Sequence, residues 1–267
     1  MTSTRSSDGT EIGYSKVGSG PAVILVDGAT GFRAFNQTGS QLAGLLAGSF
    51  TVYTYDRRGR GESGWNDAST SRFDDELADL GAMIEVAGGS AALCGFSSGS
   101  VLALEGARAG LPVTKLALYE PPFIVNGDRP PLPDDYVEQL ETAVAEDRRG
   151  DAVKIFMTKA VGLPEEYLGG MEQSPFWPTM LDVAHTIASD GAVMGRTMSG
   201  DVTALDRFAE VATETLVIYG DQTDASIIDG DQAIAKVLPN ATLEVLPGQT
   251  HDVAAEALAP VLLRYLS

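Results

Sequence analysis

The sequence predicts an α/β fold: a mainly parallel β-sheet with helices on both faces. Several short runs of branched apolar residues mark strands that are buried on both faces, as the inner strands of a parallel sheet are. Between several of these runs, apolar residues recur at steps of three and four, the pattern of an amphipathic helix. Strands that alternate with helices over short links form a parallel sheet.

The predicted elements run along almost the whole chain. Two apolar segments come first, joined by Ser7-Asp8-Gly9-Thr10, whose Asp-Gly pair signals a hairpin turn. The buried strands that follow are predicted at Ala22–Val26, Thr51–Tyr55, Ser90–Cys94, Lys115–Tyr119, Thr215–Tyr219 and Thr242–Leu246. Helices are predicted at Phe73–Ala87, Ser98–Ala109 and Ala254–Leu266.

One interval, between Tyr119 and Thr215, breaks this alternation. It contains no strong strand pattern, several prolines, and helical patterns at Asp135–Arg149, Asp151–Ala160 and roughly Pro178–Ala188. We interpret residues 123–205 as a helical lid inserted into a sheet domain made of residues 1–122 and 206–267. The sheet domain and its lid form one unit, because the lid interrupts a sheet that resumes after it.

Composition narrows the functional classes. The 267 residues carry a formal net charge of −19, which disfavours binding to nucleic acid or to an anionic membrane surface. The N-terminal residues lack the apolar run of a signal peptide, and the single cysteine, Cys94, cannot form an internal disulfide. Two histidines make a structural zinc site improbable. We expect a soluble, cytoplasmic protein without metal or cofactor; the sequence gives no indication of its oligomeric state.

The strongest functional signal is Gly95-Phe96-Ser97-Ser98-Gly99, which follows a predicted strand and opens a predicted helix. This strand–turn–helix context is the one in which a G-x-S-x-G motif holds a nucleophilic serine. The tight turn needs small flanking residues, and the helix N-terminus favours negative charge as it develops. We therefore predict Ser97 as a nucleophile.

A serine hydroxyl is a weak nucleophile unless a base takes its proton. His251 lies in Pro247-Gly248-Gln249-Thr250-His251-Asp252, just after the last predicted strand and at the same sheet edge as Ser97. The other histidine, His185, falls in an amphipathic stretch of the lid, where a packing or surface role is the simpler interpretation. His251 is therefore the predicted base.

These motifs, the lid position and the segment Asp56–Ser63 (DRRGRGES) together resemble the α/β-hydrolase family over essentially the whole chain. The resemblance implies the α/β-hydrolase fold and a Ser–His–acid site. It also assigns the arginines of DRRGRGES to a structural turn. Two departures from the family pattern concern Asp27-Gly28-Ala29, where members usually carry His-Gly, and the position of the acid.

The acid has two candidates. Members often place it three residues after a glycine beyond the strand Thr215–Tyr219, but that position is Thr223 here, with Asp224 one residue further. A minority of the family supplies the acid after the preceding strand, where this chain has Glu120. Glu120 is followed by two prolines, so the alternative interpretation is that it forms a salt bridge at the hinge of the lid. We favour Glu120 and keep Asp224 as the alternative.

Asp-Gly, the Ser-Ser pair and the early glutamate together resemble the lactonases that open the macrolide ring of zearalenone. That resemblance implies that Glu120 orients His251 and that Trp177 in the lid faces the substrate, although a lid tryptophan is more often a packing residue. The expected oxyanion hole consists of the backbone N–H of Ser98 and a donor from the Gly28–Ala29 loop. Asp27 is expected to anchor this loop through backbone N–H groups.

The function predicted from these residues is a serine hydrolase that cleaves an apolar carboxylic ester or lactone through an acyl-enzyme. The lid supplies apolar and aromatic side chains for such a substrate. Two alternatives stay open. The same three residues can support lyase or perhydrolase chemistry, since a fold does not fix a reaction. The chain could also be an inactive α/β-hydrolase-like binding protein.

Overall fold

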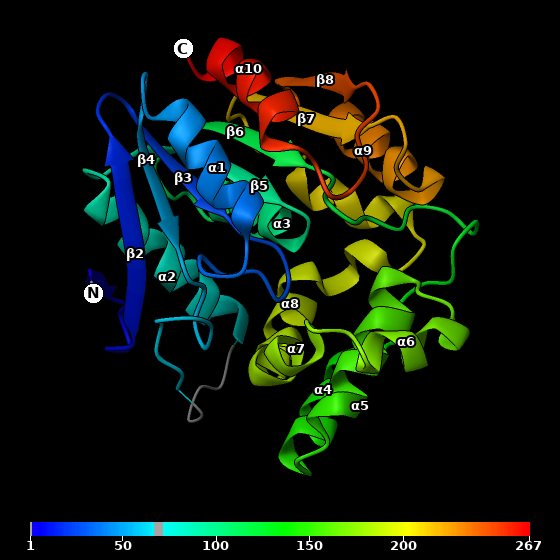
Figure 1. The fold of residues 1–267 in the computed structure, drawn as a ribbon. Helices are drawn as coiled ribbons and strands as arrows, with labels where there is room; N and C mark the ends of the chain where they lie inside the picture. Colours follow the sequence, from blue (N-terminus) through cyan, green and yellow to red (C-terminus); the bar gives the residue numbers. More distant parts are fainter. Residues whose placement is uncertain (1, 67–71) are drawn as a thin grey trace.

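A computed structural model describes residues 2–66 and 72–267. Its described residues form one sheet of eight strands in the order β1-β2-β4-β3-β5-β6-β7-β8 (Figure 1). Strand β2 pairs antiparallel with β1 and β4, and every other pairing is parallel. The strands are β1 (Ser3–Arg5), β2 (Glu11–Gly18), β3 (Ala22–Val26), β4 (Thr51–Tyr55), β5 (Ala91–Phe96), β6 (Val113–Tyr119), β7 (Thr215–Gly220) and β8 (Ala241–Leu246). The predicted mainly parallel sheet is confirmed.

Helices cover both faces of the sheet because its inner strands are apolar on both sides. In β3, Val23 and Leu25 pack with α1 (Gln37–Leu46) and α10 (Ala255–Leu266) on one face. Ile24 and Val26 point to the other face, which is covered by α2 (Arg72–Val86), α3 (Ser98–Arg108) and α9 (Ala225–Val237). Figure 1 shows α1 and α10 side by side over the sheet.

Local sequence signals account for several element boundaries. The predicted hairpin is present: β1 and β2 pair antiparallel, and Gly9 has a φ of +87° between them. Asn36 begins α1, where its side chain accepts from Gly39 N at 3.0 Å, and Asp224 begins α9 in the same way through Ser226 N at 2.9 Å. Such N-caps satisfy donors that the first helical turn leaves unpaired.

The segment between β6 and β7 is helical, as predicted. It contains α4 (Tyr136–Ala145), α5 (Arg149–Ile155), the π-helix η1 (Phe156–Val161), η2 (Glu165–Tyr167), α6 (Leu168–Glu172), α7 (Trp177–Val183), η3 (Ala184–Thr186), α8 (Ile187–Met194), η4 (Gly195–Met198) and η5 (Val202–Phe208). The helix predicted over Asp135–Arg149 is wrong at its end: α4 stops at Ala145, and Asp147 has a φ of +57° that breaks the helix before α5.

The helical segment between β6 and β7 has a small hydrophobic core of its own, and it also packs against the helices of the sheet domain. Tyr136, Leu140, Val153 and Ile187 are buried together within it. Helix α8 contacts α4 within the segment and also α2 and α3, so it joins the segment to the helices that cover the sheet (Figure 1). None of the helices in the described ranges is long and apolar enough to cross a bilayer.

The turn after β5 brings α3 against the end of β3, and Gly99 makes that approach possible. A Cβ added at Gly99 would lie 2.2 Å from the carbonyl oxygen of Val26 and 2.5 Å from that of Asp27. Both are backbone atoms, so the clash cannot be relieved by a rotamer change.

We expect Gly99→Ala to lower the free energy of unfolding by about 3 kcal/mol, because α3 and β3 must separate. Gly44→Ala in α1 is the matched control, since a Cβ there meets nothing within 4 Å. That variant should be neutral or more stable by up to about 1 kcal/mol. Urea unfolding of the three proteins measures this, and equal stability of the two variants would contradict the packing described.

Candidate active site

Ser97 occupies a strained turn between β5 and α3. Its backbone has φ 52° and ψ −125°, a conformation that residues other than glycine rarely adopt. The turn is held by Ser97 N, which donates to the carbonyl of Tyr119 at 2.9 Å, and by close packing at Gly95, where a Cβ would lie 2.4 Å from Ser100 Cα. The predicted context of Ser97, after a strand and at a helix N-terminus, is therefore present.

Glu120 directly follows β6 and is fully buried. It has a φ of +46°, and its backbone N–H donates to the carbonyl of Ile218 on the neighbouring strand at 3.0 Å. Its Oε1 accepts from Gly220 N at 2.8 Å, and its Oε2 lies 2.7 Å from His251 Nδ1. A buried carboxylate needs such partners. Glu120 and His251 are thus brought together as the sequence predicted for the favoured acid.

Thr223 occupies the position where the resemblance would place the acid of the Ser–His–acid site, and here it forms a hydrogen bond with Glu120. Its Oγ1 donates to Glu120 Oε2 at 3.0 Å. Asp224 is occupied elsewhere: its Oδ1 accepts from Ser226 N at 2.9 Å and from Ser226 Oγ at 2.5 Å. Asp224 begins α9 and has no hydrogen bond to His251 among the described contacts. The structure therefore pairs His251 with Glu120 and not with Asp224.

A cavity of about 520 Å³ lies over these residues. Ser97, Ser98 and His251 line it together with Gly28 and Ala29 of the loop after β3, so all the predicted oxyanion-hole residues border one space. The side chain of His251 is 42% exposed there, whereas Glu120 behind it is fully buried. Much of the wall is apolar and comes largely from the inserted segment: Pro122, Leu132, Tyr136, Phe156, Ala160, Val161, Met194, Met198 and Ile227.

The structure does not bring Trp177 to this cavity. Trp177 begins α7 and packs against α5, where a Cβ added at Gly150 would lie 3.3 Å from the indole Cζ2. Phe156 is the lid aromatic that lines the cavity beside Tyr136. His185 packs edge-on against Trp65, with ring centroids 4.9 Å apart. Phe156 is the first residue of the π-helical turn η1, which the sequence patterns did not predict.

A buried ion cluster connects the lid to both segments that border Ser97. Asp190 of α8 accepts from Arg57 at 2.6 Å, from Arg60 at 2.5 Å and from Ser98 Oγ at 2.8 Å. Burial alone would raise the pKa of Asp190, but the two guanidinium groups hold it below its ordinary value. Sequence analysis did not identify Asp190, because its three partners lie far from it along the chain.

The same cluster holds the loop after β3. Arg60 donates to the carbonyl of Gly28 at 2.7 Å, and Arg57 donates to that of Asp27 at 3.3 Å. The arginines of DRRGRGES, expected to serve a structural turn, are fully or almost fully buried in it.

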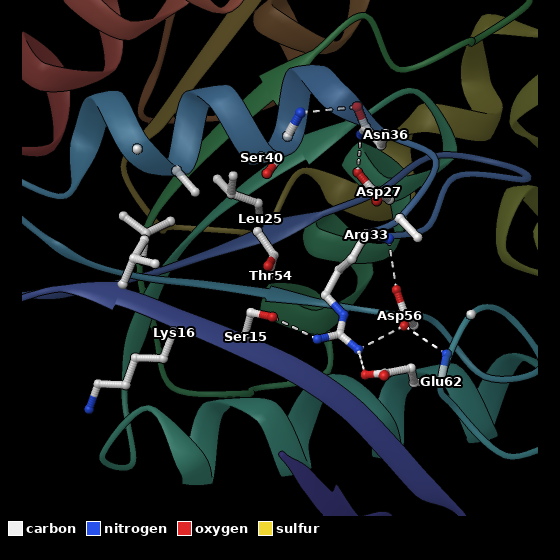
Figure 2. A pocket seen from close by; sticks show the side chains of 17 residues that line it. Ser15, Lys16, Leu25, Asp27, Arg33, Asn36, Ser40, Thr54, Asp56 and Glu62 are labelled. Carbon is white, nitrogen blue, oxygen red and sulfur yellow. Dashed lines mark hydrogen bonds and ion pairs between the residues drawn. The ribbon is translucent and has the colours of Figure 1, made fainter. Parts of the chain in front are cut away.

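Asp27 does not line the cavity of Ser97; its side chain lines a second cavity, of about 510 Å³, between α1 and β2 (Figure 2). Its Oδ1 accepts from the side-chain amide of Asn36 at 2.5 Å. The expectation that Asp27 binds backbone N–H groups of its own loop is wrong, because its side chain turns toward the start of α1. On the far side of this cavity, Asp56 accepts from Arg33 (Figure 2).

Metal ligands are not grouped in the described part of the chain: no three His, Cys, Asp or Glu side chains are arranged to hold an ion.

The ionisation of Asp27 gives a prediction about pH. Burial raises the pKa of Asp27 from 3.8 to about 6, against the opposing effects of Asn36 and Arg60. Between these two values the native protein holds a proton that the unfolded chain has lost, so stability falls as the pH rises through this window.

We therefore expect Asp27→Asn to be more stable than the natural chain at pH 7 by up to roughly 3 kcal/mol, with the difference shrinking toward about pH 4. Urea unfolding of both proteins at the two pH values measures it. Asp128→Asn, which changes an exposed carboxyl, should have little effect at either pH. A stability difference for Asp27→Asn that does not change with pH would refute this account of the buried carboxyl.

Comparison with known proteins now places the chain. It is 45% identical, over 100% of both chains, to an alpha/beta hydrolase of Sphaerobacter thermophilus, with a TM-score of 0.89. It is 24% identical to a non-heme chloroperoxidase of Kitasatospora aureofaciens over 92% of this chain and 90% of that protein. A thermophilic esterase of Thermogutta terrifontis, 20% identical over 99% of this chain and 97% of the esterase, superimposes with a TM-score of 0.69. Residues 23–261 match the model of the alpha/beta hydrolase family, and the chain belongs to that family.

Proposed function

We propose that this protein is a serine hydrolase that cleaves a carboxylic ester or lactone through an acyl-enzyme. The observation that carries the proposal is the 2.7 Å contact between Glu120 Oε2 and His251 Nδ1, beside the cavity that Ser97 lines. A carboxylate on Nδ1 holds the imidazole in the tautomer whose Nε2 accepts a proton. The strained turn at Ser97 presents the hydroxyl to the same cavity.

The proposed reaction has two half-reactions. Ser97 Oγ attacks the carbonyl carbon while His251 Nε2 takes the hydroxyl proton. The tetrahedral intermediate collapses, the carbon–oxygen bond of the ester breaks, and His251 returns the proton to the leaving alkoxide. Water then attacks the acyl-enzyme with His251 again as base, releasing the acid and free Ser97. In a lactone the alcohol and acid remain in one product molecule.

The negative charge of the tetrahedral intermediate needs preorganised donors. We assign this role to the backbone N–H of Ser98 and to the Gly28–Ala29 loop. Both segments border the cavity, and both are held from behind by the cluster of Asp190, Arg57 and Arg60. Loss of one such donor typically costs on the order of 3 kcal/mol of transition-state stabilisation.

A second candidate uses the same acyl-enzyme with hydrogen peroxide in place of water, which yields a peracid and free Ser97. The similarity of this chain to a non-heme chloroperoxidase supports this second candidate. Peracid formation from a carboxylic ester and hydrogen peroxide, measured beside hydrolysis, separates the two reactions. A larger yield of peracid than of acid at modest peroxide would favour the second candidate.

We expect the protein to hydrolyse members of a panel of aryl esters and macrocyclic lactones, and Ser97→Ala to lose that activity by roughly 10⁴-fold or more. Removing the nucleophile leaves only the binding and oxyanion contributions. Initial rates by chromatography of the products measure it.

Ser40→Ala is the matched control, since Ser40 lies on α1 at the second cavity and should tolerate the change (Figure 2). Hydrolysis that survives in Ser97→Ala would exclude Ser97 as the nucleophile. No turnover of any panel member by the natural chain, together with tight binding of one of them, would favour a binding protein.

A further inference from the structure

The cavity that holds Ser97 and His251 also contains a cation. Arg129 lies in the long connection between β6 and α4 and is half-buried. It is the only lysine or arginine among the described residues that line the cavity. The rest of the inserted segment contributes a mostly apolar wall there, with Leu132, Phe156 and Met198 among its members. Partial burial of a guanidinium in such surroundings costs free energy unless the group forms hydrogen bonds or an ion pair.

The partners of Arg129 within the protein are few. Its Nη2 donates to the carbonyl of Ala160 in η1, and Gly162 packs against the guanidinium, where a Cβ would lie 3.3 Å from Nη2. In the part of the chain that the structure describes, no carboxylate lies within 4.0 Å of it. Arginine has five N–H donors, so most of them are left for another acceptor.

The other buried arginines show the contrast. Arg57 and Arg58 each pair with carboxylates, Arg57 with Glu76 at 2.8 Å and Arg58 with Asp79 at 2.7 Å. Burial lowers the pKa of Arg129, and the charge of Asp224 opposes this effect. Arg129 therefore differs from Arg57 and Arg58 in that no carboxylate of the described residues forms an ion pair with it.

The acidic residues of the cavity do not take the place of a partner. Asp190 is committed to Arg57 and Arg60. Asp224 lies at the N-terminus of α9 and accepts from Ser226, where the helix dipole offsets part of its charge. Asp252 is exposed beside His251.

We propose that Arg129 binds a carboxylate of the substrate, so that the preferred substrate is an ester or lactone with a free carboxylate beyond an apolar spacer. A planar guanidinium matches a carboxylate in geometry as well as charge. This inference rests on the proposed function for the identity of the reacting group, and it narrows the substrate to a monoanionic one.

Binding to Ser97→Ala tests the inference without any turnover. Calorimetry compares monomethyl with dimethyl esters of adipate, suberate and sebacate, which vary the spacer. We expect the tightest half-ester to bind about tenfold better than its diester, and this preference to disappear when Arg129→Gln is added. Arg129→Lys should keep part of it, because the charge remains but the fork is lost. The preference should weaken as salt is raised.

Arg196→Gln is the matched control: it removes one positive charge from the lid at a side chain that is 80% exposed and outside the cavity. It should keep the preference. If Arg129 serves only to cap η1, Arg129→Gln will weaken half-ester and diester equally, which would overturn the inference. A preference that persists in Arg129→Gln, or the absence of any preference in Ser97→Ala, would also overturn it. Arg129-dependent binding without hydrolysis by the natural chain would refute the proposed function alone.

Discussion

The candidate site depends on one buried carboxylate at the end of β6. Glu120 adopts a positive φ directly after a buried strand, and Gly220 N, Thr223 Oγ1 and His251 Nδ1 surround its two oxygens. These partners come from the next strand, the loop after it and the loop after β8. Because an unpaired buried carboxylate is costly, the pairing fixes three loops relative to one another. His251 inherits its orientation from that arrangement.

The second constraint is the connection between the lid and the loops beside Ser97. Asp190 places one carboxylate between Arg57, Arg60 and Ser98, and the two arginines reach on to the carbonyls of the loop after β3. Removing one member would leave a buried charge unpaired, so the cluster acts as a unit. The inserted segment consequently does two things: it supplies the apolar wall of the cavity, and through α8 it holds the backbone that the proposed oxyanion hole uses.

Sequence patterns predicted the parallel sheet, the helical insertion and the positions of Ser97 and His251, because apolar periodicity and a strand–turn–helix motif are local signals. They favoured Glu120 over Asp224 only through a resemblance, and the contact with His251 depends on a loop 131 residues away. Asp190, Arg129 and the side of the cavity that Phe156 lines have no local signature. Trp177 was expected to face the substrate only through a resemblance, yet it packs on α5.

We propose that Glu120, and not Asp224, orients His251 in the reaction. The most direct measurement is kcat for Glu120→Gln and Asp224→Asn on one ester, with native circular dichroism verified for both. The account predicts that Glu120→Gln loses roughly 10⁴-fold, because the amide removes the charge that stabilises the imidazolium, while Asp224→Asn keeps most of its activity. A dead Asp224→Asn beside an active, folded Glu120→Gln would contradict it.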